Sequence, residues 1–270
     1  MDGPIAYRRL LLTGAAGGLG RVLRPAMRAW APSLRVSDVA PMDPAQGNEE
    51  IVPCDLGDER AMRGLLEGVD AVVHMGGISS DKPWAPILQA NIVGVYNLYE
   101  SARIHGTKRI VFASSNHAIG FYPRTTRIDA DDPVRPDSLY GVSKTFGESL
   151  SHFYFDRYGI ESVCIRIGSA FPEPRDRRML VTWLSYEDLT GLVHASLFAP
   201  RVGHTIAFGA SANRDIGLWW DNSKAAHLQW KPRDNSEPFR AARESEPLPD
   251  PSSPIERFQG GAYVTSGPYE

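Results

Sequence analysis

Cysteine is scarce in this chain, which holds only Cys54 and Cys164, each within a short apolar stretch. Two such thiols cannot form a disulfide framework or complete a zinc site, so we expect them to be small buried side chains. Long hydrophobic runs are lacking too, because the residues after Arg8-Arg9 stay apolar only until Thr13. That run is too short for a signal peptide core or a membrane span, which predicts a cytoplasmic location and no membrane partner.

Neither sign of charge dominates, because 29 Lys and Arg residues face 32 Asp and Glu residues, for a net charge of -3. The sequence therefore lacks the basic excess of nucleic-acid-binding proteins, and no nucleic-acid partner is expected. The 25 glycines and 21 prolines follow no triplet repeat, which excludes a collagen-like chain. With 42% hydrophobic residues, the 270-residue chain can form a large globular core. Its His, Asp and Glu residues show no metal-ligand spacing, so no metal is expected.

Short apolar runs alternate with amphipathic stretches as far as residue 209. The apolar runs predict strands at residues 10–13, 33–39, 51–53, 71–74, 109–114, 162–167 and 205–209. Helical periodicity predicts helices at residues 19–30, 58–66, 87–105, 139–158 and 185–198. Alternation of this kind builds right-handed βαβ units. We therefore expect an α/β fold with a Rossmann-like, doubly wound parallel sheet and helices on both faces.

The alternation ends near Ala210. One short helix is expected at residues 222–228, a proline-rich stretch follows at 246–254, and residues 257–270 show no helical period. Trp219-Trp220 is better explained as core of this part than as a platform for a sugar. We expect residues 1–209 to form the Rossmann-like domain that carries the functional residues, and residues 210–270 to form a compact C-terminal extension packed on it.

A glycine-rich loop joins the first expected strand to the first expected helix. Its glycines are spaced as in dinucleotide-binding loops, in the run Thr13-Gly14-Ala15-Ala16-Gly17-Gly18-Leu19-Gly20. Gly14 would allow the tight turn, Gly17 would let the backbone approach a pyrophosphate, and Gly20 would let helix and strand pack closely. The helix N-terminus would add free N–H groups for the phosphates. A loop without a ligand is the alternative, but the strand-to-helix context favours a cofactor.

Asp38 ends the second expected strand. A carboxylate there can accept both ribose hydroxyls of an adenosine and would repel a 2′-phosphate, which favours NAD over NADP. Arg35 is the nearest cation, but it is set back from the tip of the strand. Asp55-Leu56 follows the third strand and could cap the adenine, although a lone Asp there also serves as a turn or helix former.

Tyr140 and Lys144 open a long expected helix and share one face of it, because they are four residues apart. A free phenol has a pKa near 10, so only about 0.1% of it is phenolate at pH 7. A neighbouring ammonium and a nicotinamide cation would lower that pKa and make the tyrosine a general base. Ser115, at the end of the fifth expected strand, would supply a hydroxyl partner.

These motifs together resemble the short-chain dehydrogenase/reductase superfamily in its extended, sugar-acting branch. Supporting residues are the glycine loop, Gly76-Gly77 after the fourth strand, Asn91 in the next helix, Ser115 and the Tyr140/Lys144 pair. Longer strings resemble a narrower family, the bacterial uronate dehydrogenases, over nearly the whole chain. Among them are Phe112 to His117, Arg166 to Ser169, Arg178 to Leu180, Gly209 to Asn213, Trp219 to Asn222 and Arg257 to Gly261.

The resemblance implies NAD-dependent oxidation of D-glucuronate and D-galacturonate at the anomeric carbon, with release of an aldarolactone, in hexuronic acid catabolism. It implies that Tyr140 is the base, that Lys144 holds the nicotinamide ribose and lowers the tyrosine pKa, and that Ser115 steadies the reacting oxygen. The substrate contacts it implies are Ser79, Ser115, Asn116, His117, Ser169 and Arg178. The cofactor contacts it implies are Gly18, Leu19, Asp38, Asp55, Leu56, Met75, Gly76, Gly77, Ile78, Ser79, Lys144 and Ala170.

Several alternatives remain open at this point. Arg178, the expected partner of the uronate carboxylate, also lies in an Arg175-Asp176-Arg177-Arg178 run that is typical of a solvated loop. His117 could bond a sugar hydroxyl or cap a loop. The chain departs from the resembling family at residues 214–218, a seemingly longer loop, and at Ala170, where a cysteine is expected. If that loop borders the pocket, substrate preference could differ.

Two other functions compete with a dehydrogenase. One is a nucleotide-sugar epimerase or dehydratase that retains NAD, although the part after the last strand is short for a nucleotide diphosphate lobe. The other is a redox-sensing regulator without catalysis, which would be expected to lose the Tyr/Lys pair. Helices of this fold often form subunit interfaces, so we expect a homo-oligomer that acts on a small hexuronic acid.

Overall fold

A parallel sheet forms the centre of the computed structural model, which describes residues 5–247 and 250–267. Within these ranges its strands run in the order β3-β2-β1-β4-β5-β6-β9, and every neighbouring pair is parallel. The chain leaves β1 toward β2 and later crosses to β4, so the two halves of the sheet diverge between β1 and β4. The bounds are β1 (Arg9–Thr13), β2 (Ser33–Ser37), β3 (Glu49–Ile51), β4 (Ala71–His74), β5 (Arg109–Ser115), β6 (Glu161–Ile167) and β9 (His204–Gly209).

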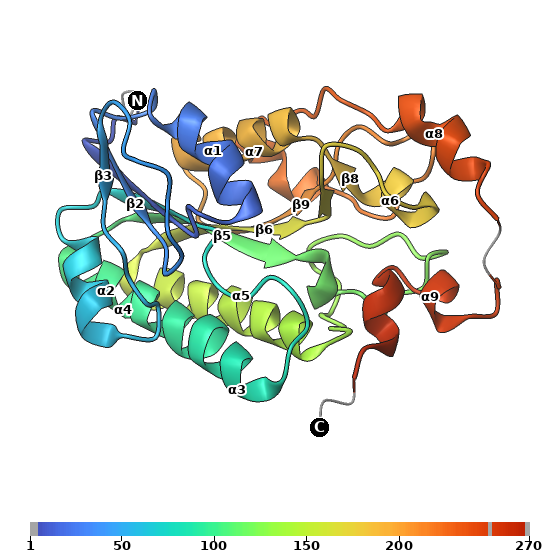
Figure 1. Ribbon diagram of the computed structural model, residues 1–270, viewed down its shortest axis with the longest axis horizontal. Coiled ribbons are helices and arrows are strands. Elements are labelled where there is room, and N and C mark those ends of the chain that lie inside the picture. The colour runs from blue at the N-terminus through green and yellow to red at the C-terminus, as the bar shows by residue number, and fades with distance from the viewer. Residues whose placement is uncertain (1–4, 248–249, 268–270) are drawn as a thin grey trace.

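Helices cover both faces of the sheet (Figure 1). One face carries α1 (Gly18–Met27) and α7 (Tyr186–Phe198), and the other carries α2 (Glu59–Leu66), α4 (Gly94–His105) and α5 (Leu139–Tyr158). Leu10 and Leu12 of β1 belong to the core on the first face, while Leu11 belongs to the core on the second. A strand buried on both sides must be apolar at every position, which is why the run at residues 10–12 does not alternate. The predicted doubly wound α/β fold is confirmed.

Several predicted bounds are wrong by a few residues. The first helix ends at Met27 rather than at residue 30, and Pro25 lies within its last turn. Trp30 lies in the turn after the helix and still packs against the apolar core, with its ring against His194 and Phe198 of α7. The third strand spans residues 49–51 rather than 51–53, because only Glu49–Ile51 pairs with β2.

The predicted helix at residues 87–105 is not a uniform α-helix. It begins with the short α3 (Trp84–Ile87), continues as a π-helical segment at Leu88–Val93, and becomes α-helical in α4. Asn91 lies in the π-helical segment and is buried there. Wide turns of this kind often occur at functional sites, and this one directs Asn91 toward the loop that follows β4.

The segments between β6 and β9 and after β9 contain elements that the sequence pattern did not predict. They are β7 (Ser169–Ala170), α6 (Arg177–Thr182), β8 (Trp183–Leu184), α8 (Glu237–Glu244), α9 (Pro254–Arg257) and a 3-10 turn, η4 (Gly261–Thr265). η4 lies in the stretch that shows no helical period, and a single turn of 3-10 helix is too short to produce one. The predicted helix at 222–228 is a 3-10 helix, η3 (Ser223–Leu228). Residues 268–270 of that stretch, and 248–249 of the proline-rich stretch, lie outside the described residues.

Buried side chains agree with two expectations from the sequence. Cys54 and Cys164 are both free and buried. Trp220 is core, stacked on Phe208 with ring centroids 5.5 Å apart. A search of the described part of the chain finds no helix with the length and apolar character that crossing a membrane requires.

Candidate functional site

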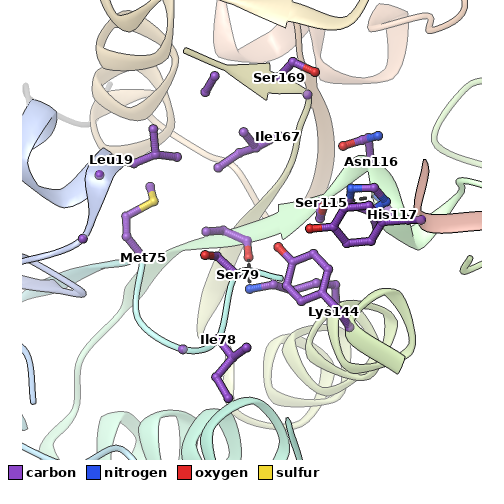
Figure 2. A pocket seen from close by; sticks show the side chains of 18 of the residues that line it. Leu19, Met75, Ile78, Ser79, Ser115, Asn116, His117, Lys144, Ile167 and Ser169 are labelled. Atoms are coloured by element: carbon purple, nitrogen blue, oxygen red, sulfur yellow. Dashed lines mark hydrogen bonds between the residues drawn. The ribbon is translucent and has the colours of Figure 1, made fainter. Parts of the chain in front are cut away.

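A cavity of about 1320 Å³ opens at the carboxyl ends of the central strands. Loops that follow β1, β2, β4, β5 and β6 contribute to it, as expected at the point where a doubly wound sheet reverses direction. Figure 2 shows Ser79, Ser115 and Lys144 around this space. Every residue predicted for the site lines it: Gly14, Gly17, Gly18, Leu19, Gly20, Asp38, Asp55, Leu56, Met75, Gly76, Gly77, Ile78, Ser79, Ser115, Asn116, His117, Tyr140, Lys144, Ser169, Ala170 and Arg178.

At two positions of the glycine loop, Gly14 and Gly20, a side chain does not fit. Gly14 has φ +70°, and a Cβ there would lie 2.5 Å from the backbone of Met75. A Cβ on Gly20 would lie 2.0 Å from the carbonyl oxygen of Gly14, so the helix can approach the turn only at a glycine. α1 begins after Gly17 with no side chain capping its first N–H groups. An uncapped helix N-terminus that lines a cavity is suited to bind a pyrophosphate.

Asp38 lies one residue beyond β2, at the rim of the cavity. Its carboxylate accepts hydrogen bonds from the backbone N–H of Ala16 and of Ala40, both at 3.0 Å, which fixes its position next to the glycine loop. Arg35 is turned away, because its guanidinium binds the Glu50 carboxylate and the carbonyl of Leu65. The end of β2 therefore presents a negative charge without this arginine beside it, which suits ribose hydroxyls better than a 2′-phosphate.

Two further loops shape the same end of the cavity. Asp55 uses its carboxylate locally, accepting from the N–H of Gly57, while the carbonyl of Leu56 is held by Asn97. The loop after β4 is fixed by Asn91, whose amide accepts from the N–H of Ile78 and donates to its carbonyl. Asn91 also donates to Ser143 of α5, so this loop and the helix bearing the Tyr/Lys pair are locked to one another.

The Tyr/Lys pair lies in the first turns of α5, which Ser138 caps by accepting from the N–H of Gly141. Tyr140 and Lys144 are both buried, and Lys144 Nζ is 5.4 Å from the centroid of the phenol ring. Lys144 Nζ donates to the carbonyl of Ala113 on β5 at 2.8 Å. Ser115 ends the same strand and hydrogen bonds with the Tyr140 phenol. Tyr140 and Lys144 of α5 and Ser115 of β5 therefore meet at one point of the cavity.

Burial dominates the pKa values of this group. Desolvation raises the pKa of Tyr140 above its ordinary value, and the hydrogen bond with Ser115 offsets only part of the rise. Desolvation also lowers the pKa of Lys144 to about 8. In the chain without cofactor, burial therefore determines both pKa shifts, because a region of low dielectric disfavours each charged form. The expected lowering of the tyrosine pKa by the ammonium together with a nicotinamide cation stays a prediction.

The opposite end of the cavity is polar and basic. Arg178 lies in the first turn of α6, and its Nε donates to the carbonyl of Gln259 at 2.5 Å. With the Asn116 amide oriented to donate to the carbonyl of Ile167, its oxygen accepts from Arg178 Nη2 at 2.6 Å. Ser169 hydrogen bonds with Thr182 at 2.8 Å. Arg178 is thus held by two partners at the cavity wall rather than in a solvated loop.

The other members of the arginine run are placed differently. Arg175 is exposed and stacks its guanidinium 3.8 Å from the ring centroid of Phe171. Arg177 donates to the backbone carbonyls of Glu244 and Glu246. Residues 214–218, the loop expected to be longer than in the resembling family, do not line the cavity, so the structure gives this loop no direct contact with a ligand there.

Sequence analysis missed several residues at the basic end. Gly260, Gly261 and Tyr263 line the cavity, and the Tyr263 ring stacks on the His117 ring with centroids 3.6 Å apart. Asp137 accepts a hydrogen bond from His117. Short loop segments of this kind have no periodicity, and only the Arg257 to Gly261 string drew notice to the region. No group of three or more metal-ligating side chains was found in the part of the chain that the structure describes.

A doubly wound sheet, an uncapped helix after a glycine loop, an acidic residue at the tip of β2 and a buried Ser/Tyr/Lys group define a nicotinamide-dependent dehydrogenase of the short-chain type. Residues 10–185 match the model of the NAD dependent epimerase/dehydratase family. The sequence is 57% identical to the uronate dehydrogenase of Pseudomonas putida over 264 residues, 97% of this chain and 98% of that protein. It is 55% identical to the uronate dehydrogenase of Agrobacterium fabrum, over 95% of this chain and 97% of the other.

Solved structures give the same result. The crystal structure of uronate dehydrogenase from Agrobacterium tumefaciens superimposes with a TM-score of 0.92 and 54% identity, over 96% of this chain and 97% of that one. A tyrosine-to-alanine mutant of that enzyme, solved in complex with NAD, matches equally well. The chain therefore belongs to the NAD dependent epimerase/dehydratase family, and within it to the uronate dehydrogenases.

Membership in this family confirms three expectations from the sequence. The protein is an enzyme, its cofactor is NAD, and its reaction is the NAD-dependent oxidation of a uronate. Three uronate dehydrogenases match 95–97% of this chain, which argues against a nucleotide-sugar epimerase and against a regulator without catalysis.

Proposed function

We propose that this enzyme oxidises D-glucuronate and D-galacturonate at C1 to the corresponding aldarolactones, within hexuronic acid catabolism. The observation that carries this proposal is that a buried Ser/Tyr/Lys group and an arginine line one cavity. The buried Tyr140, Ser115 and Lys144 line the same cavity as Arg178, whose guanidinium lies beside Asn116, the residue next to Ser115. A hexuronic acid has both groups that such a cavity would bind, an anomeric hydroxyl on C1 and a carboxylate on C5, the two carbons that flank the ring oxygen.

The cavity fits NAD along its glycine-lined half. The space at Gly14 and Gly20 excludes side chains and the start of α1 is uncapped. Asp38 lines the same cavity and is bonded to the glycine loop through the Ala16 N–H. We assign the pyrophosphate to the amides of Gly18 and Leu19. The remaining contacts are assigned to Asp55, Leu56, Met75, Gly76, Gly77, Ile78, Ser79, Lys144 and Ala170, which line the same space. When bound, NAD⁺ supplies a hydride acceptor and a positively charged ring.

The side chains of this enzyme prepare the substrate for loss of a hydride from C1. Arg178 pairs with the carboxylate, for which a guanidinium fork is well shaped, and Asn116, His117, Ser79 and Ser169 contact the sugar. Ser115 and Tyr140 hold the C1 hydroxyl. The Tyr140 phenolate oxygen takes the hydroxyl proton as the C1–H bond breaks, and the C1–O bond becomes the carbonyl of the lactone. Because the ring oxygen stays bonded to C1, the product is a lactone.

The charge on Lys144 assists this step. Its ammonium stabilises a phenolate at Tyr140, and its donation to the Ala113 carbonyl fixes the ammonium beneath the ring. Since burial alone raises the tyrosine pKa, the positive charge of the bound cofactor is needed to bring the phenol into its working range.

We further propose that residues 210–270 act as an extension of the domain formed by residues 1–209, that the enzyme is a homo-oligomer, and that it works in the cytoplasm. The extension is supported by the contacts of Gln259 and Tyr263 with Arg178 and His117. No nucleic acid or membrane partner is proposed.

The proposal is tested by NADH formation, followed by absorbance, with purified protein and a panel of uronates, neutral aldoses and nucleotide sugars. We expect turnover with D-glucuronate and D-galacturonate and a much lower kcat/KM with glucose and galactose, which lack the carboxylate. Turnover of a nucleotide sugar without net NADH would instead indicate an epimerase. Equal kcat/KM values for uronates and neutral aldoses would refute the role of Arg178.

A further inference from the structure

His117 is held by a buried carboxylate. Its Nδ1 lies 2.8 Å from Asp137 Oδ2, and the Asp137 side chain has no solvent exposure. An ionised carboxylate can only accept hydrogen bonds, so the neutral imidazole must carry its proton on Nδ1. The other ring nitrogen, Nε2, has no hydrogen-bond partner among the described residues, and the ring lines the cavity.

Asp137 is itself fixed from three sides. Ser138, the cap of α5, donates its hydroxyl to the other carboxylate oxygen at 2.9 Å. A Cβ on Gly120 would lie 1.7 Å from Asp137 Oδ2, and one on Gly260 would lie 2.0 Å from the same atom. Those two glycines are joined by a backbone hydrogen bond of 2.8 Å. The carboxylate therefore occupies a slot that only glycines leave open, between the loop after β5 and the chain near residue 260.

The imidazole plane is fixed as well. Tyr263 stacks on it at 3.6 Å between centroids, and Tyr140 meets its edge at 5.8 Å. The charged groups that face the ring are Asp137, Arg178 and Asp81. Burial outweighs both carboxylates and lowers the pKa of His117, so the ring is neutral at pH 7. A neutral ring with a proton on Nδ1 presents a bare lone pair at Nε2.

We propose that Asp137 is a positioning residue that locks His117 in the Nδ1–H tautomer, so that Nε2 accepts a hydrogen bond from a hydroxyl of the sugar. The proposal rests on the proposed function, and it sharpens the substrate class. An acceptor at Nε2 selects a hydroxyl donor and offers nothing to a carboxylate, which leaves Arg178 to hold the acid. His117 and Arg178 then bind two different groups of one molecule, a hydroxyl of the sugar ring and the carboxylate.

The tautomer can be measured without turnover. Long-range proton–nitrogen NMR of the ¹⁵N-histidine-labelled protein distinguishes a protonated from a bare ring nitrogen, and the variant His117→Gln identifies the signal among the seven histidines. At pH 7.5 we expect His117 to be Nδ1–H in the wild type. In Asp137→Asn the amide can donate to Nδ1, which moves the proton to Nε2. A wild-type spectrum showing an Nε2–H tautomer or an imidazolium overturns the proposal, even if Asp137→Asn does not fold.

Kinetics test the consequence for the substrate. Asp137→Asn should raise KM for uronates about tenfold, the value of one lost hydrogen bond, with a smaller change in kcat and an unchanged KM for NAD. The control Asp131→Asn removes the same charge from an exposed loop residue and should leave both constants unchanged. A wild-type KM in Asp137→Asn refutes the proposal. If the protein turns over no uronate, the proposed function fails, while the NMR result still decides the role of Asp137.

Discussion

At the scale of single residues, burial disfavours the charged forms of Tyr140 and Lys144, the two forms that the proposed chemistry requires. Each side chain lies in a region where desolvation disfavours its charged form. The apolar surroundings that exclude water also keep the phenol protonated in the free protein. If Tyr140 is the general base, as we propose, it becomes active when the positive charge of the cofactor binds nearby, and the protein without cofactor holds little phenolate.

Replacement of Tyr140 by phenylalanine tests the assignment of the base. Tyr140→Phe should lower kcat for uronate oxidation by at least ~10²-fold, because it removes the proton acceptor and keeps the ring. NAD affinity, measured by fluorescence titration, should change little. Tyr158→Phe is the matched control, since that tyrosine lies at the exposed end of the same helix. Near-normal turnover in Tyr140→Phe would reject the assignment.

His74 is a buried titratable residue of β4, next to the site. It hydrogen bonds with Thr13 Oγ1 at 2.7 Å and stacks on Phe112. Burial, aided by the charge on Lys144, lowers its pKa to about 3. Below pH 6.5 the His74 imidazole becomes protonated in the unfolded chain but stays neutral in the folded chain. This histidine therefore costs stability as the pH falls from about 6.5 toward 3.

The wild type should consequently lose stability in this pH window, with His74 contributing up to about 1.4 kcal/mol per pH unit. His74→Gln should flatten the dependence, whatever its effect on stability at pH 7.5. The measurement is urea denaturation at several pH values between 7.5 and 4.5. Parallel curves for the two proteins would show that His74 titrates normally in the folded state.

At the scale of elements, the site depends on loops that are held rigid by close backbone contacts. The first turn of α1 approaches the loop after β1 only because Gly20 has no side chain. Asn91, placed by the π-helical segment, holds the loop after β4 through both backbone groups of Ile78. Both devices prearrange the cofactor half of the cavity before any ligand binds.

Gly20→Ala tests the close approach. Its Cβ would lie 2.0 Å from the Gly14 carbonyl oxygen, so either helix or loop must move. We expect a loss of about 1–3 kcal/mol in the free energy of unfolding and a weaker affinity for NAD. The control Gly64→Ala, where a Cβ meets nothing within 4 Å on α2, should be stabilising by about 0.4–1 kcal/mol. Wild-type stability and NAD affinity in Gly20→Ala would contradict the packing argument.

At the scale of the whole molecule, residues 260–263 form part of the cavity wall next to Arg178. Gln259 is fully buried, and its side chain accepts from Trp220 Nε1 and donates to the carbonyls of Pro123 and Thr126. Its own carbonyl accepts from Arg178. Gln259 therefore joins the last part of the chain, the loop after β5 and Arg178, the residue that we propose binds the substrate carboxylate.

Gln259→Ala should leave the Trp220 indole N–H and the Thr126 carbonyl without their Gln259 partner and lower the free energy of unfolding by about 2 kcal/mol. It should also raise KM for uronates more than KM for NAD, because Arg178 loses its fixed partner geometry while the cofactor half is untouched. Denaturation and steady-state kinetics measure both effects. Gln46→Ala, the same change at an exposed position, should stay within about 0.5 kcal/mol of the wild type. Equal changes in both KM values would argue against a local role.

The sequence by itself determined the parts of the protein that local pattern encodes. Uninterrupted apolar runs of strand length predicted β1 and β4, because a strand covered on both faces is apolar throughout. The glycine spacing predicted the turn into α1, and the Tyr/Lys spacing predicted one helix face. Each of these depends on residues within a few positions of one another, so their geometry follows from the period of a helix or strand.

Only the tertiary structure decided the substrate half of the site. There the fold brings together residues from distant parts of the chain. Asp137 is hydrogen-bonded to His117, Tyr263 stacks on the His117 ring, and the Gln259 carbonyl accepts a hydrogen bond from Arg178. They lie in loops and single turns without periodicity. Burial likewise set the directions of the Tyr140 and Lys144 pKa shifts, since desolvation depends on every group packed around a side chain. Such effects arise when the chain closes on itself, and no short stretch of sequence contains them.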